Sequence, residues 1–191
     1  MRYVHFLLSF IIILSLGAAA QDEPKRAPST ADERQRFLTL TRKLEQNPLD
    51  KNLYIDKKWA KQWLEDIPDI NVNICAPVLF GTDFIREQNK YTPQLSYQAT
   101  FGEAAYIIEH PDKKGDTTAQ YLAGVESALK AYSAITKNEP AAKSKALDDL
   151  LEKQKQGKLA DFVRDASKEC DDRKEGSLQQ NRDGSLQEVI R

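Results

Sequence analysis

Residues 92–108, TPQLSYQATFGEAAYII, carry apolar or small side chains almost all the way around a helix. Thr92 is a residue type that caps helices, and Pro93 suits the first helical position. A helix that is apolar on every face is typical of the centre of a bundle, because no side of it is suited to water. We therefore expect this segment to form the central, buried helix of an all-α protein.

The next apolar segment, residues 116–138, predicts a second long helix, which Pro140 ends. Gly102 and Gly124 lie inside these two predicted helices, beside alanine residues. Glycine costs about 1 kcal/mol relative to alanine in a helix interior, so a glycine there suggests a packing reason. We expect the backbones of the two helices to approach closely at Gly102 and Gly124.

Shorter helices are expected on either side of this pair, from N-cap residues followed by apolar residues at helical spacing. They are predicted at residues 30–46, 50–67, 144–157 and 159–170. Trp59 and Trp63 recur at i, i+4 with Ile55, which favours core packing over an exposed platform for a ligand. The expected fold class is a compact orthogonal bundle of about six or seven helices.

Residues 69–80 fit two patterns. Ile70, Val72 and Ile74 alternate with asparagines, which is typical of a strand. Ile70, Ile74 and Val78 also share one helical face, although Pro77 would kink that helix. Helix is the preferred interpretation, and strand remains open.

Residues 1–20 have the three regions of a secretory signal peptide. Arg2 precedes an apolar run at residues 6–16, and Ala18 and Ala20 are the small residues expected before a cleavage site. The run is shorter than the roughly 20 apolar residues that span a membrane. We expect cleavage after Ala20 and a periplasmic or secreted protein.

The chain that remains after cleavage would be near-neutral. The full chain has 28 basic and 29 acidic residues, a net charge of −1, and loss of Arg2 would make it −2. This balance gives no electrostatic reason to bind nucleic acid or an anionic membrane. The expected organisation is a flexible lead-in at 21–29, a single helical domain at 30–170 and a disordered polar tail at 171–191.

Cys75 and Cys170 are the two cysteines of the chain. Export would place them in an oxidising compartment, where an even number of cysteines favours pairing. We predict a Cys75–Cys170 disulfide; two buried free thiols are the alternative. No other cysteine use is expected, since the chain has no CxxC motif.

The candidate site residues are Glu103, Glu126 and His110. Glu103 lies in the most apolar segment and Glu126 borders the apolar face of the next, so together they could form an acid/base pair in a pocket. A glutamate that reaches solvent from the edge of a packed face is the commoner situation. His110, the single histidine after the leader, precedes Pro111 at a predicted helix end, where a cation favours the helix dipole.

No other motif indicates catalysis. The paired aspartates at 148–149 and 171–172 lack the further oxygen ligands of a metal loop, and the sequence has neither a phosphate-binding glycine loop nor GxSxG. We therefore predict no catalytic residues, no metal and no cofactor, and we favour a protein without enzymatic activity.

Four segments of the chain resemble a group of uncharacterised exported helical proteins of bacteria. They are residues 40–49 (LTRKLEQNPL), 107–112 (IIEHPD), 121–129 (YLAGVESAL) and 147–151 (LDDLL). The resemblance implies export and helicity, and it implies no activity.

Two further resemblances concern binding. Residues 128–140 are similar to the second helix of a tetratricopeptide repeat, although no second copy occurs at the 34-residue period. Residues 121–129 with the later Cys170 are similar to immunity proteins that neutralise periplasmic amidases, which carry additional cysteines. These resemblances imply a protein partner.

Three functions are thus expected for this chain. The first is a non-enzymatic module that binds another protein. The second is an inhibitor or immunity-type binder of a periplasmic hydrolase. The third is a small-ligand carrier or enzyme with a pocket at Glu103 and Glu126.

Overall fold

The computed structural model describes residues 26–73, 75, 77–78 and 89–182, with only the course of the helix given for 171–182. The predicted signal peptide, the start of the lead-in and the last nine residues lie outside this part of the chain. All regular structure in the described ranges is helical, which confirms the all-α fold. The helices are α1 (Ala31–Gln46), α2 (Tyr54–Asp66), α4 (Thr92–Glu109), α5 (Thr117–Asn138), α6 (Lys145–Lys155) and α7 (Leu159–Arg182).

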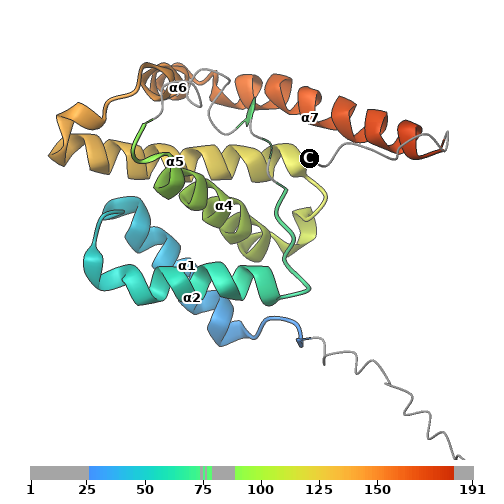
Figure 1. The fold of residues 1–191 in the computed structure, drawn as a ribbon, viewed down its shortest axis with the longest axis horizontal. Coiled ribbons are helices and arrows are strands. Elements are labelled where there is room, and N and C mark those ends of the chain that lie inside the picture. The colour runs from blue at the N-terminus through green and yellow to red at the C-terminus, as the bar shows by residue number, and fades with distance from the viewer. Residues whose placement is uncertain (1–25, 74, 76, 79–88, 183–191) are drawn as a thin grey trace, which may run out of the picture.

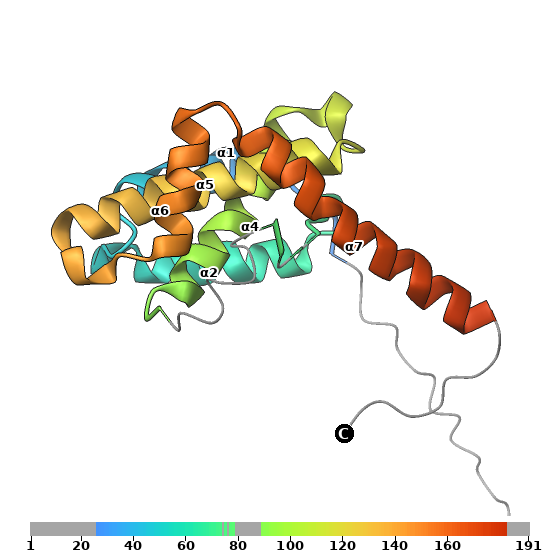
Figure 2. The same cartoon turned by 90° about the horizontal axis from the view of Figure 1, so that it is seen from above.

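Helices α4 and α5 lie at the centre of the molecule. Helices α1 and α2 lie on one side of them, and α6 and α7 on the other (Figure 1). From above, the end of α7 projects beyond the rest of the bundle (Figure 2). Short 3₁₀ turns precede α2, α5 and α6, at Lys51–Leu53, Pro111–Lys113 and Pro140–Ala142.

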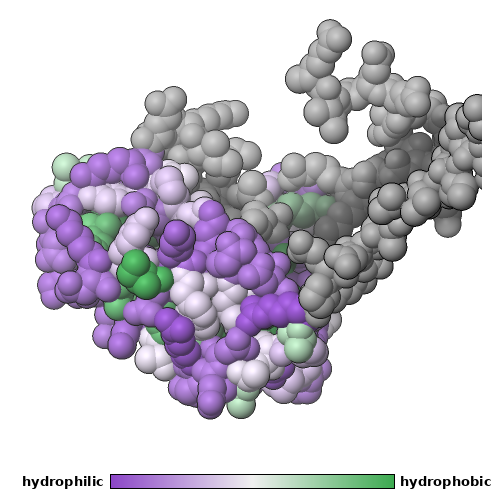
Figure 3. Space-filling view, turned by 60° about the horizontal axis from the view of Figure 1, so that its bottom comes forward, coloured by the Kyte–Doolittle hydropathy of each residue, from purple (hydrophilic) through white to green (hydrophobic). Residues whose placement is uncertain are grey.

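The outer surface on the side of α1 and α2 is mostly hydrophilic, with small hydrophobic patches (Figure 3). Within the described ranges, no helix is both long and apolar enough to cross a membrane.

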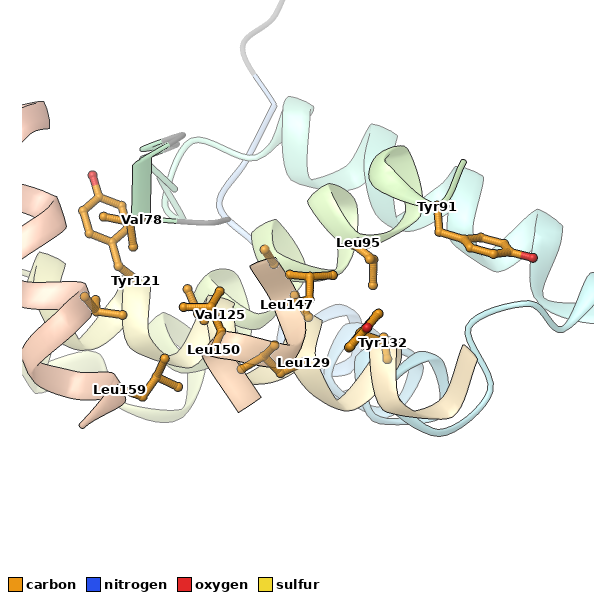
Figure 4. Packing of buried hydrophobic residues seen from close by; sticks show 14 of the residues in the cluster. Val78, Tyr91, Leu95, Tyr121, Val125, Leu129, Tyr132, Leu147, Leu150 and Leu159 are labelled. Carbon is orange, nitrogen blue, oxygen red and sulfur yellow. The ribbon is translucent and has the colours of Figure 1, made fainter. Parts of the chain in front are cut away.

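The buried side chains form two clusters, one on each side of the central helices. The larger cluster joins α4 and α5 to α6 and α7, and includes Tyr121, Val125, Leu129 and Leu147 (Figure 4). The smaller cluster joins α1 and α2 to the other face of α4. Its centre is aromatic: the rings of Phe37 and Trp63 lie 4.8 Å apart, and those of Phe37 and Phe101 5.2 Å apart.

Helices α4 and α5 cross where Gly102 and Gly124 were expected to meet. A Cβ atom on Gly102 would lie 2.5 Å from the Ser127 Cβ and 2.9 Å from the Ala123 carbonyl oxygen. A Cβ atom on Gly124 would lie 2.7 Å from the Glu103 Cγ. All three distances are shorter than a Cβ atom tolerates, so each glycine is required by the close approach of the two helices.

Gly102→Ala is therefore expected to destabilise the protein by about 1–3 kcal/mol. The free-energy cost of packing a methyl group into the crossing exceeds the gain in helix propensity from replacing glycine by alanine. Urea unfolding measures the change. Gly115→Ala is the matched control, because a Cβ there would meet nothing within 4 Å. Equal stability of the two variants would contradict this account of the crossing.

Three of the predicted helix starts are confirmed by their caps. The Thr30 side chain accepts a hydrogen bond from the Glu33 backbone, and the Glu33 carboxylate accepts one from the Thr30 backbone in return. Asp116 and Ser144 cap α5 and α6 through their side chains. Gly157, with φ +70°, follows α6 in the left-handed conformation that glycine favours. The expected cap at Thr92 is wrong, because α4 begins after Tyr91 without a side-chain cap and the Thr92 hydroxyl donates to the Asn89 carbonyl oxygen instead.

The helix preferred over 69–80 is not formed at residues 69–73, which have irregular backbone, and no strand forms there either. Ile70 is nevertheless buried in the smaller cluster, and Cys75 and Val78 in the larger one. The segment therefore crosses from the smaller cluster, which Ile70 and Val72 contact, to the larger one, and residues 77–78 are helical.

Two other expectations differ from the structure. Ile55 is 69% exposed, while Trp63 is buried as predicted and Trp59 is half-buried beneath the Arg36 guanidinium. Helix α7 does not end at Cys170 but continues to Arg182. Lysine, glutamate, arginine and glutamine are good helix formers, so the loss of an apolar face at that point does not stop the helix.

The predicted disulfide is confirmed. Cys75 and Cys170 are bonded, with their Cα atoms 6.0 Å apart. Cys75 belongs to the segment between α2 and α4, and Cys170 lies on α7, so the bond ties that segment to the far side of the bundle.

Candidate functional site

Glu103 is buried at the crossing of α4 and α5 and is 1% exposed. Its side chain lies against the Gly124 backbone, and neither carboxyl oxygen has a hydrogen-bond partner among the described residues. Burial raises the pKa of this carboxyl to about 8. Glu103 is therefore mostly protonated and neutral at pH 7, which avoids the cost of an unpaired buried charge.

The structure does not bring Glu126 and His110 to this carboxyl. Glu126 is half-buried and lies two residues beyond Gly124, which is about 200° around α5. His110 follows the end of α4, about 10 Å along the helix axis from Glu103. Its ring stacks on Tyr106, and its Nδ1 atom lies 3.0 Å from the Tyr106 carbonyl oxygen. No hydrogen bond or ion pair links the three candidates within the described part of the chain.

A groove lies between α2 and α4, away from those residues. It has a volume of about 420 Å³, and its floor includes the buried side chains of Leu44, Gln98 and Phe101. Tyr54 of α2 and Tyr97 of α4 form its walls, and they are 64% and 43% exposed. The remaining lining residues are Pro48, Lys57, Lys58, Lys61, Pro93 and Gln94.

The groove continues past its α2 wall. A second hollow, of about 430 Å³, shares Pro48, Tyr54, Lys57 and Gln94 with the first. The Lys57 ammonium lies 3.4 Å from the carbonyl oxygen of Pro48, at this shared boundary. The two hollows together form an elongated and open depression, which we call the α2–α4 groove.

The charged residues that line the α2–α4 groove are all positive. Its lining includes Lys57, Lys58 and Lys61 in the first hollow and Lys51 in the second, and no acidic residue. The Lys61 ammonium lies 4.9 Å from the centre of the Tyr97 ring, and its hydrogen bond to Tyr97 raises the pKa of this amine. Lys61 therefore stays protonated at neutral pH and acts as a fixed positive charge, not as a base.

Beneath the floor, a buried polar chain joins α4, α5 and α1. Gln98 Nε2 donates to Ser127 Oγ at 2.8 Å, and Ser127 Oγ donates to Glu45 Oε1, also at 2.8 Å. Arg42 and Lys130 pair with the Glu45 carboxylate at 2.8 and 3.4 Å. Because these bonds turn the Gln98 amide away from the groove, the floor is left mainly to apolar atoms.

The residues of the α2–α4 groove escaped the sequence analysis, although one signal was available. Tyr54, Lys57, Lys58 and Lys61 recur at i, i+3, i+4 and i+7, which places them on one face of α2. A lysine stripe of this kind is ordinarily a solvated face. The aromatic residue within it, and the exposed Ile55 beside it, distinguish this face from an ordinary one.

The arrangement is suited to binding. The groove lining has apolar, aromatic, amide and cationic groups, and it contains no histidine, serine, cysteine or carboxylate. In the described ranges, no three His, Cys, Asp or Glu side chains are close enough to hold a metal ion. No protein-family model, curated protein or solved structure matches the chain, so the site is defined by its own geometry.

Proposed function

We propose that this protein is an exported, non-enzymatic binding module that holds a segment of another protein in the α2–α4 groove. One observation carries the proposal: an open, elongated depression with a buried apolar floor lies between exposed tyrosines. Tyrosine is enriched in protein interfaces and at their energetic centres, because its ring buries a large area while its hydroxyl remains satisfied by water.

The openness of the groove favours a peptide segment over a small molecule. Pockets for small ligands enclose about 70–90% of the ligand surface. Here the side chains of Tyr54 and Tyr97, which form the walls, are 64% and 43% exposed. A chain segment that lies along the groove would cover these side chains, which a small compound inside the first hollow would leave in water.

The placement of the acidic residues gives no support to the alternative of a ligand pocket at Glu103 and Glu126. Glu103 is enclosed at the crossing, and Glu126 lies on a different side of α5. A binding role for the α2–α4 groove requires neither of them.

A photoreactive benzoylphenylalanine in place of Tyr97 is expected to give a discrete cross-linked adduct with one protein of the exported fraction of the source cells. Mass spectrometry would map the adduct to one segment of that protein. A synthetic peptide of the segment should then suppress the cross-link, because it would occupy the same groove.

Asp161 is the matched control position, since its side chain is 65% exposed and its helix, α7, lies on the opposite side of the central helices (Figure 1). The same photoreactive residue there should give no such adduct. Failure to label from position 97, or labelling of the same protein from both positions, would refute the proposal.

A further inference from the structure

We infer that the segment held in the α2–α4 groove is acidic and carries one large apolar side chain; this inference rests on the proposed function. Its basis is charge complementarity. The groove gathers Lys51, Lys57, Lys58 and Lys61, whereas the chain as a whole has a net charge of −1. The groove is thus a positive region on a protein whose remaining residues carry a net charge of −5, from 24 basic and 29 acidic residues.

The acidic residues near these lysines in the sequence do not neutralise them. Asp56 pairs with Arg36 of α1 at 2.7 Å, and Asp50 accepts a hydrogen bond from the Asn52 backbone. Glu65, one helical turn beyond Lys61, interacts with it electrostatically but does not line the groove, and Asp66 accepts a hydrogen bond from Gln62. Among the described residues, none of the four lysines lies within ion-pair distance of a carboxylate.

The spacing of the lysines suits carboxylates on a regular segment. Lys57 and Lys61 are one helical turn apart, about 6 Å along the axis of α2. Acidic side chains at i, i+4 of a helix, or at i, i+2 of an extended strand, have a similar separation. The apolar floor at Leu44 and Phe101 would take a large side chain of the same segment, and the rings of Tyr54 and Tyr97 would flank it.

The lysines are expected to select the partner more than to supply its affinity. Ion pairs between long, exposed side chains contribute little, because solvent and salt screen them. They do raise the association rate of an oppositely charged partner and disfavour a basic one. The apolar floor is left to hold the segment in place.

Selection from an unbiased peptide library tests the inference. A phage library of random peptides of about twelve residues, long enough to follow one helix of this length, would be panned on the purified, oxidised protein. We expect the enriched peptides to be net acidic, to share one aromatic or large aliphatic residue, and to bind more weakly as salt is raised.

Three variants make the outcome decisive. The combined Lys57→Gln, Lys58→Gln and Lys61→Gln variant should bind these peptides up to about tenfold more weakly, mainly through a slower association rate, and should lose the preference for acidic over basic peptides. A variant with Lys113, Lys137 and Lys143 replaced by Gln is the control, because it loses the same charge from exposed positions outside the groove and should bind normally. Tyr97→Ala reports whether a peptide uses the groove at all.

The failures of the two proposals are distinct. Peptides that lose binding in Tyr97→Ala but are neutral or basic, or that are unaffected by loss of the groove lysines, would overturn the acidic-segment inference and leave the groove as a binding site. If no peptide is enriched, or all enriched peptides are indifferent to Tyr97→Ala, both the inference and the proposed function are overturned.

Discussion

Loss of the Cys75–Cys170 bond is expected to lower the free energy of unfolding by about 4–5 kcal/mol, the chain-entropy value for a loop of this length. The two cysteines are 95 residues apart, so the bond restricts a large part of the unfolded chain. Domains of this size are stable by only about 5–15 kcal/mol. We therefore expect the reduced protein to be only marginally stable at about 37 °C.

Urea unfolding with and without a reducing agent measures this effect. Cys170→Ala is the cleaner variant, because Cys170 is only half-buried, whereas replacement of the buried Cys75 would also remove core packing. Reduction should destabilise the wild type as much as the substitution does, and it should leave Cys170→Ala unchanged. Equal stability of the oxidised wild type and Cys170→Ala would show that the bond contributes nothing.

The wild type is expected to lose stability as the pH rises from about 4.5 to about 8, and Glu103→Gln is expected to abolish this pH dependence. The pKa of the buried carboxyl is about 8 in the folded protein, against an ordinary value of 4.5. Across that interval the folded state holds a proton that the unfolded state has released, so stability falls as pH rises. The full shift corresponds to about 5 kcal/mol, and the neutral amide of glutamine has no such dependence.

Chemical unfolding of both proteins at pH 5 and pH 8 gives the comparison, and the difference between their pH dependences isolates residue 103. Glu126→Gln, which removes the half-buried carboxyl of α5, should keep the wild-type dependence. If Glu103→Gln and the wild type respond equally to pH, the carboxyl of Glu103 is not a buried neutral group in solution.

The centre of the bundle could be predicted from sequence because several local signals agree there. The all-round apolar character of residues 92–108 placed α4 at the core, and Gly102 and Gly124 identified the crossing with α5. The disulfide was also predictable, since the chain has just two cysteines. In these cases the residue type itself indicates its structural role: an all-apolar helix is buried, a glycine within a helix marks a close approach, and two cysteines can form one bond.

The candidate site was less predictable because it depends on three segments that are distant in sequence. Its floor combines Leu44 of α1 with Phe101 of α4, and its rim comes from α2. The sequence shows Lys57, Lys58 and Lys61 as an ordinary solvated face. It also gives Glu103 and Glu126 similar positions beside apolar residues, although the crossing encloses the first and leaves the second half-exposed.

The segment after α2 shows a different limit. Alternation of apolar and polar residues predicts regular structure when one face is buried against one neighbour. Ile70 and Val72 instead contact the smaller cluster from irregular backbone, and Val78 is buried in the larger one, so the alternation forms neither a strand nor a helix over residues 70–73.

The position of the disulfide divides the chain topologically. Residues 75–170 form a closed covalent ring that contains α4, α5 and α6, whereas α1 and α2 precede Cys75 and lie outside it. One wall of the α2–α4 groove is therefore enclosed in the ring, and the other belongs to a free arm of the chain. No covalent bond other than the chain itself joins the arm formed by α1 and α2 to this ring, so noncovalent packing against α4 sets the width of the groove.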